Sequence, residues 1–371
     1  MLHLKEIAAI ALAIFLAEAP ARAAEIATAD DTARFLAGMP PSAGSPLAPL
    51  TSDSAWQRHA RFFDAAFAQL EQRQLSKIRA WGNAYLAAPK PTMFYMFSGP
   101  DFLYADAFYP KATTYVLSAL EPPGVVPDLT RLSRPALAAA LYNVERSMAS
   151  ILSFSFFITE SMKLDLREGQ LSGTLPILYV FLARSGKTIL DVTPVALDAN
   201  GTPHLGKENA GKNATQGVRI EFAGPDRQQK TLYYFSTDLS NSSVRVSGFL
   251  KFSETLAPAN SLIKSASYLL HSGNFTAARK FLLSHSNVII QDDSGIPLAF
   301  YDPKVWRLFP FGRYARPIDK FPGRYQPDYA EIFRRAQPID FGIGYRSRPG
   351  RSGLLVATRK ESAAQRDASK R

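Results

Sequence analysis

Two apolar runs, separated by a turn and an aromatic segment, stand out between residues 93 and 121. The first run is Met93–Phe97 and the second is Thr113–Leu120. The turn Ser98–Asp101 and the aromatic segment Phe102–Tyr109 lie between them. Because parallel strands are usually joined by a helical crossover, this stretch predicts a β-α-β unit.

The rest of the chain changes period several times. Apolar residues recur at helical spacing over residues 54–87 and again from about residue 128 to residue 166. Leu175–Ala183 and Thr188–Leu197 are apolar runs of strand-like composition, and the polar residues 184–187 between them predict a hairpin turn. Shorter strands are predicted at Val218–Phe222, Thr231–Ser236, Val288–Ile290 and Leu354–Ala357, with helices between residues 257 and 286.

These patterns predict an α/β protein. Its mixed sheet is expected to contain a parallel β-α-β unit near residues 93–121 and a central β-hairpin, with flanking helices. The predicted body is single and covers residues 52–357. Residues 24–51, rich in Ala, Pro, Ser and Gly, are interpreted as a linker or loosely packed opening segment. Residues 358–371 are expected to form a mobile basic tail.

Composition is that of a globular protein, with 46% hydrophobic and 20% charged residues in a chain of 371. The chain has no cysteine. Disulfides, thiolate zinc sites and cysteine nucleophiles are therefore excluded.

Residues 1–23 are interpreted as a signal peptide. Lys5 precedes an apolar core, Ile7–Leu16, and Ala21-Arg22-Ala23 has the form of a cleavage site. An uncleaved N-terminal anchor is the alternative, although the apolar core is short for a membrane span. We therefore expect a bacterial periplasmic or secreted protein with no transmembrane span once the signal is removed.

Three segments resemble those of a known family. They are FSGPDFLYADAFYP from Phe97, YVLSALEPPG from Tyr115 and IIQDDSGIP from Ile289. They are similar to segments of a family of exported bacterial proteins of uncharacterised function, over most of the mature chain. The resemblance implies no activity and assigns no catalytic residue.

Two glycine-containing turns superficially match phosphate-binding loops. Ser185–Thr188 reads SGKT, but the motif needs a glycine where Phe181 stands, and it belongs between a strand and a helix. The turn Ser98–Asp101, with Glu121 about twenty residues later, has the layout of a dinucleotide-binding fold. It contains one glycine, however, and Pro100 lacks the N–H that would face a phosphate. No cofactor is therefore predicted.

Carboxylates near the predicted parallel strands form the first candidate site. Open α/β sheets bind ligands at the carboxyl ends of their strands. Asp101, Asp106 and Glu121 are therefore candidates to line a crevice, together with Tyr95 and Tyr104. The alternative is structural: Asp101 caps the following helix, and Glu121 pairs with an arginine.

A second acidic site follows the strand predicted at residues 288–290. Asp292 and Asp293 are adjacent, as expected of a divalent-cation ligand pair or an acid–base pair. The calcium-loop spacing is missing, and a D-S-G turn needs no function. A catalytic triad of Ser294, His285 and an aspartate has no supporting motif. No histidine spacing typical of zinc is present, so no metal site is predicted.

Nearly all of the net charge of +11 lies in residues 304–371, where arginines alternate with aromatic residues. Arginine binds phosphate and carboxylate groups, and exposed aromatic rings stack on sugars. The alternative is a solvated basic face paired with its own acidic residues. The candidate ligand-binding residues are Arg307, Arg313, Tyr314, Arg316, Arg324 and Tyr325.

Three functional hypotheses follow. The first is an envelope-associated protein that binds an anionic or saccharide ligand, such as an anionic envelope glycan or lipid; nucleic acid is not an expected partner. The second is a hydrolase of an envelope polymer that uses carboxylates. Its candidate catalytic residues are Asp101, Glu121, Asp292 and Asp293. The third is a structural or protein-interaction role. The sequence does not determine the oligomeric state.

Overall fold

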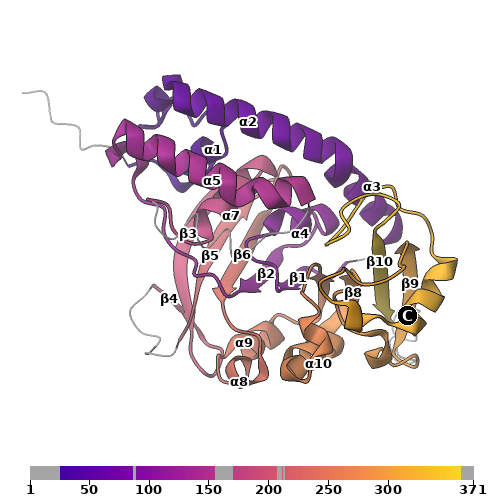
Figure 1. Ribbon diagram of the computed structural model, residues 1–371. Helices are drawn as coiled ribbons and strands as arrows, with labels where there is room; N and C mark the ends of the chain where they lie inside the picture. Colours follow the sequence, from indigo (N-terminus) through magenta and orange to yellow (C-terminus); the bar gives the residue numbers. More distant parts are fainter. Residues whose placement is uncertain (1–25, 87–88, 155–169, 207–210, 212–213, 361–371) are drawn as a thin grey trace, which may run out of the picture.

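A mixed β-sheet lies between two layers of helices (Figure 1). This computed structural model describes residues 26–86, 89–154, 170–206, 211 and 214–360. Its strands are β1 (Thr92–Met96), β2 (Thr114–Ala119), β3 (Thr188–Leu197), β4 (Pro203–Leu205), β5 (Thr215–Ala223), β6 (Gln229–Ser236), β7 (Ala259–Ile263), β8 (Ser286–Gln291), β9 (Trp306–Gly312) and β10 (Gly353–Arg359). Over these residues the 10-stranded sheet has the order β4-β3-β5-β6-β2-β1-β7-β8-β10-β9, which confirms the predicted α/β class.

The helices surround this sheet on both sides. They are α1 (Ala29–Leu36), α2 (Ser54–Leu70), α3 (Ser76–Tyr85), α4 (Phe102–Phe108), α5 (Arg134–Phe154), α7 (Leu175–Arg184), α8 (Asn241–Val244), α9 (Phe249–Thr255), α10 (Thr276–His285) and α11 (Pro327–Ile332). A π-helical turn, Glu71–Leu75, connects α2 to α3, so the helix predicted over residues 54–87 is confirmed as one nearly continuous rod from Ser54 to Tyr85.

Five neighbouring strands, β6, β2, β1, β7 and β8, run parallel. β1 pairs with β2 from Thr92↔Thr114 to Met96↔Ser118, and α4 is the crossover between them, as predicted for residues 93–121. The chain steps from β1 to β2 in one direction and from β7 to β8 in the other. The direction of winding therefore reverses between β1 and β7, where open α/β sheets usually bind ligands.

β1 and β7 separate toward their carboxyl ends. Their pairing covers Thr92↔Ala259 to Phe94↔Ser261, although β1 continues to Met96 and β7 to Ile263. The last residues of each strand are therefore not bridged to the other strand.

Alternating side chains of β1 divide the core into two layers. Met93 and Tyr95 belong to the cluster that packs under α1, α2, α3, α4, α5 and α7. Phe94 and Met96 belong to the cluster on the opposite face, with α8, α9 and α10. Because successive strand residues point to opposite faces, a fully apolar strand such as β1 is what a sheet covered on both sides requires.

The strand predicted at Leu175–Ala183 is wrong, because these residues form helix α7. All nine are buried, so the helix is apolar on every side and shows no amphipathic period. Periodicity cannot distinguish such a helix from a buried strand. The turn at residues 184–187 therefore joins a helix to β3, and antiparallel hairpins instead join β3 to β4 and β5 to β6.

β7 also differs from the prediction, which placed only helices between residues 257 and 286. It is five residues long and fully buried, and it contains the polar residues Asn260 and Ser261. Ser261 Oγ lies 2.7 Å from Ser286 Oγ of β8, so the serine hydroxyl is satisfied between strands. A short strand with polar residues in the sheet interior has neither strand alternation nor an apolar run.

The opening segment interpreted as loose is packed where the structure describes it. Residues Ala29–Leu36 form α1, with Phe35 and Leu36 fully buried, and Trp56 of α2 stacks on Phe35. Residues 1–23, residues 155–166 of the second predicted helix and the tail beyond residue 360 lie outside the described residues.

Candidate functional site

A cleft of about 220 Å³ opens at the carboxyl ends of β1, β2, β6 and β7. We call it the carboxyl-end cleft. It lies where β1 and β7 separate, so the topology of the sheet places it. Its lining residues with polar side chains are Tyr95, Ser98, Asp101, Glu121, Thr237, Asp238, Lys264, Ser265, Ser267 and Tyr345, and its apolar wall includes Phe97, Leu239 and Phe275.

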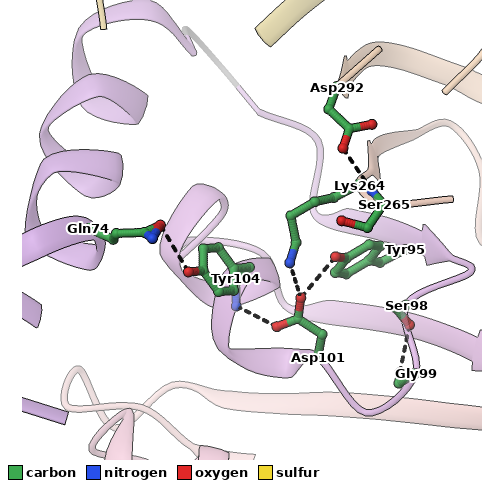
Figure 2. A network of polar contacts seen from close by, with 9 residues as sticks. All are labelled: Gln74, Tyr95, Ser98, Gly99, Asp101, Tyr104, Lys264, Ser265 and Asp292. Atoms are coloured by element: carbon green, nitrogen blue, oxygen red, sulfur yellow. Dashed lines mark hydrogen bonds and ion pairs between the residues drawn. The ribbon is translucent and has the colours of Figure 1, made fainter. Parts of the chain in front are cut away.

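A buried ion pair forms the floor of the cleft (Figure 2). Lys264 Nζ lies 2.9 Å from Asp101 Oδ2, and each side chain is 1% exposed. The Tyr95 hydroxyl donates to the same oxygen at 2.9 Å, and the Tyr104 N–H donates to Asp101 Oδ1 at 3.1 Å. Asp101 therefore caps α4, as the structural alternative predicted, and also neutralises Lys264.

Aromatic packing fixes the other side of Lys264. Its Nζ lies 4.0 Å from the centroid of the Tyr104 ring, an arrangement typical of a cation–π contact. The Tyr104 hydroxyl donates to Gln74 Oε1 at 3.0 Å, which anchors the ring to the π-helical turn before α3. The position of the ammonium group is thus set by β1, α4 and the long helical rod together.

The loop after β7 forms one wall of the cleft with an unusual backbone. Ser265, Ser267 and Tyr268 have φ of 55°, 50° and 55°, and Phe97 on the facing loop has φ of 65°. Non-glycine residues in this region cost free energy and gather at functional sites. Four of the five such residues in the described chain therefore lie at or beside the carboxyl-end cleft.

The second acidic segment holds this loop in place from behind. Asp292 Oδ2 accepts from Ser265 N–H at 2.9 Å, and Ser294 Oγ accepts from Ala266 N–H at 2.8 Å. The Tyr268 hydroxyl donates to Asp293 Oδ2 at 2.5 Å. The two acidic segments thus meet through residues 264–268, yet Asp292 and Asp293 lie outside the lining of the cleft.

Burial raises the pKa of both carboxyls of this turn. The pKa of Asp293 is raised to about 7, first by burial and then by the neighbouring Asp292, against the opposing effects of Tyr268 and Arg346. Asp292 Oδ1 accepts from both the N–H and the hydroxyl of Ser294. Both oxygens of Asp292 are therefore engaged in holding backbone.

The predicted carboxylates thus separate into three groups. Asp101 and Glu121 line the cleft, whereas Asp292 and Asp293 support its wall. Asp106 lies elsewhere, 2.8 Å from Lys187 Nζ.

The triad drawn from Ser294 and His285 does not assemble. His285 Nε2 lies 3.4 Å from Glu254 Oε1, and its Nδ1 lies 3.1 Å from the Phe281 carbonyl. Ser294 Oγ donates to Asp292, so no imidazole is positioned to take its proton.

The predicted basic residues do not line the cleft. Arg307, Arg313, Arg316 and Arg324 are exposed, and none of them lines it. Arg316 pairs with Asp319 at 3.4 Å, as the alternative of a self-paired face expected. The Tyr314 ring is buried against Tyr329 and stacks on the half-exposed Tyr325.

The sequence did not indicate the residues contributed by β7 and by the apolar wall. Lys264, Ser265 and Ser267 were hidden because β7 itself was not predicted. Phe275 lies in a 3₁₀ turn before α10, and its ring centroid is 5.9 Å from that of Phe97. The only available signal was the serine-rich stretch after Ile263, which is typical of a loop.

Over the described ranges, no three His, Asp or Glu side chains gather as metal ligands. Nor does any helix in that part of the chain have both the length and the apolar character to cross a membrane. Comparisons with protein-family models, curated proteins and solved structures gave no match.

Proposed function

We propose that the protein is an exported, envelope-associated binding protein that takes a small neutral saccharide unit in the carboxyl-end cleft. The observation that carries this proposal is the composition of the cleft. An aromatic wall faces serine hydroxyls and carboxylates, and the one lysine is neutralised by Asp101. Pockets of this kind combine apolar surface with a few polar groups that fix the orientation of a ligand.

The aromatic wall supports a saccharide because sugar rings present apolar C–H faces. Phe97 and Phe275 come from opposite sides of the β1–β7 junction, and their rings lie at 57° to each other. Both are partly exposed rather than absorbed into the core. Burying one face of a sugar against such rings removes apolar surface from water.

Polar groups of the cleft match hydroxyls. Ser265 Oγ is buried and has no hydrogen-bond partner within the described residues, so a ligand hydroxyl would satisfy it. Asp238 stands at the edge of the cleft, exposed. Although burial acts in the opposite direction, hydrogen bonds from Ser240 and Ser243 lower the pKa of Asp238. It is therefore an ionised acceptor at neutral pH.

The charge of the cleft favours a neutral ligand over an anionic one. Three carboxylates line it, from Asp101, Glu121 and Asp238, against the single cation Lys264. An anion would enter a site with an excess of negative charge, which disfavours its binding. The exposed arginines of the C-terminal part belong to a separate surface.

The hydrolase alternative has less support. Asp101 is held by Lys264, Tyr95 and the start of α4, and Asp292 is held by backbone N–H groups. A general acid needs a proton to give, and a nucleophile needs a free oxygen. Because ion pairs and hydrogen bonds already occupy the oxygens of Asp101 and Asp292, these carboxylates are poor candidates for a general acid or a nucleophile.

Ser265→Ala is expected to weaken saccharide binding by about three- to tenfold without lowering the melting temperature, because the hydroxyl makes no hydrogen bond to the protein within the described residues but would make one to the ligand. Calorimetric titration with glucose, N-acetylglucosamine and their β-linked dimers would measure the affinity.

Phe275→Ala should abolish measurable saccharide binding in the same titration, because it removes an aromatic ring from the apolar wall of the cleft.

Tyr325→Ala is the matched control, because it removes an exposed aromatic ring outside the cleft. Binding that survives in both cleft variants, or binding that high salt abolishes, would argue against the proposal. Absence of saturable binding by any of these sugars would do the same.

A further inference from the structure

A second pocket, of about 490 Å³, lies on the face of the sheet that α4 and α7 cover, and it shares no lining residue with the carboxyl-end cleft. It is bounded by the π-helical turn, the start of α4, the end of α7 and the β5–β6 turn. We call it the lysine pocket. Its charged lining residues are Glu71, Arg79, Asp106, Arg184, Lys187, Asp226 and Lys230.

Two lysines in this pocket are almost completely buried. Lys187, at the start of β3, is 8% exposed, and Lys230, in β6, is 3% exposed. Lys187 Nζ lies 2.8 Å from Asp106 Oδ1. Lys230 Nζ donates instead to the Pro110 carbonyl at 2.7 Å, so its contact is a neutral oxygen. Buried lysines are normally paired with a carboxylate, and Lys230 has none at ion-pair distance among the described residues.

The lining of the pocket carries four basic and three acidic side chains. Burial lowers the pKa of Lys230, the nearby Lys187 lowers it further, and Asp226 and Asp106 oppose both effects. Arg184 adds a donor, because its Nη2 is buried without a hydrogen-bond partner. The other two nitrogens of this guanidinium contact the Ala37 carbonyl and Asp64. The pocket therefore holds more donors than acceptors.

The Ser185-Gly186-Lys187 turn contributes its lysine side chain but no backbone donors. The N–H groups of Ser185, Gly186 and Lys187 donate to carbonyls of the last turn of α7. In a phosphate loop the corresponding N–H groups point at the ligand, and a helix begins there. Here a helix ends, so any anion would be held by side chains alone.

We propose that the lysine pocket binds a small tetrahedral oxyanion of the phosphate type, held by Lys187, Lys230 and Arg184. Such an ion accepts several hydrogen bonds at once and would satisfy the ammonium group that lacks a carboxylate. The shared chemistry is the phosphate group, whether as free phosphate or on a phosphorylated sugar. Because the pocket is separate from the carboxyl-end cleft, this inference does not depend on saccharide binding there.

The experiment is a titration with inorganic phosphate at constant ionic strength, followed by calorimetry. Sodium chloride serves as the reference salt. We expect saturable binding that Lys230→Met weakens at least tenfold, because the variant removes one of two ammonium groups. Asp226→Asn should strengthen binding about two- to fivefold. Asp226 is exposed on the β5–β6 turn, and asparagine can still accept from the Gln228 N–H as the aspartate does.

Each outcome decides the proposal. Absence of saturable phosphate binding up to about 10 mM would overturn it. Equal affinity in Lys230→Met would place the ion elsewhere and also overturn it. Should Lys230→Met fail to fold, Asp226→Asn still decides, because unchanged or weaker binding contradicts the expected sign. Glucose 6-phosphate binding more tightly than free phosphate would identify the sugar phosphate as the source.

Discussion

Lys264→Met is expected to lower the free energy of unfolding by about 3–5 kcal/mol, because it leaves the Asp101 carboxylate buried without its ion-pair partner. Both side chains are 1% exposed, so water cannot replace the lost contact. Asp101 also accepts hydrogen bonds from the Tyr95 hydroxyl and from the first turn of α4, and these two bonds keep the carboxylate at its buried position in the variant. Urea denaturation at pH 7 would measure the change.

The double variant Lys264→Met/Asp101→Asn shows how much of the lost stability comes from the unpaired carboxylate and how much comes from the changed packing of the Lys264 side chain. Asparagine can still accept from the Tyr104 N–H, and it carries no charge that needs a partner. Most of the lost stability should therefore return, which is non-additive behaviour. Arg316→Met is the matched control, because it breaks the exposed pair with Asp319 and should change stability by less than about 1 kcal/mol. A double variant less stable than Lys264→Met alone would contradict this account.

Asp293→Asn is expected to stabilise the protein at pH 8 by about 2–4 kcal/mol and to have little effect at pH 4. The pKa of Asp293 is raised from 3.8 to about 7 in the folded state. Between these values the folded state holds a proton that the unfolded state has released, so stability falls as pH rises. Above pH 7 the wild type buries a carboxylate beside Asp292, and asparagine removes that charge while it still accepts from Tyr268.

The measurement is denaturant unfolding of both proteins at half-unit steps from pH 4 to pH 8. The stability difference should grow through this range and level off above pH 7. Asp319→Asn, at an exposed position, serves as the control and should show no such trend. A stability difference that is largest at pH 4, or a destabilised variant at pH 8, would show that the folded state favours the charged form.

The sequence predicted those strands that form continuous apolar runs, because a sheet covered on both faces requires apolar residues on both sides of a strand. β1, β2, β6, β8 and β10 were located because their residues are apolar and lie between strong turns. The crossover α4 followed from the short distance between β1 and β2, because few other connections of that length join parallel strands. Of the residues that line the carboxyl-end cleft, the sequence analysis identified the carboxylates Asp101 and Glu121 but not the residues that follow β7.

The failures have physical causes in two segments. α7 is buried on every side, so its hydrophobic pattern carries no helical period. β7 places Asn260 and Ser261 inside the sheet, where Asn260 Nδ2 donates to the Lys90 carbonyl and Ser261 Oγ contacts Ser286 Oγ of β8, and a local pattern cannot show such partners. Lys264 was overlooked for the same reason, because its role depends on Asp101, which is more than 160 residues away in the chain.

The position of β10 has a consequence for how the chain is completed during synthesis. β10 is the last described strand, yet it lies between β8 and β9 rather than at an edge. Until residues 353–359 leave the ribosome, β9 has no partner and one side of β8 stays open. An open strand edge invites pairing with other chains. A stop codon shortly before Gly353 should therefore yield an aggregation-prone product, although every lining residue of the carboxyl-end cleft and of the lysine pocket precedes Gly353 in the chain.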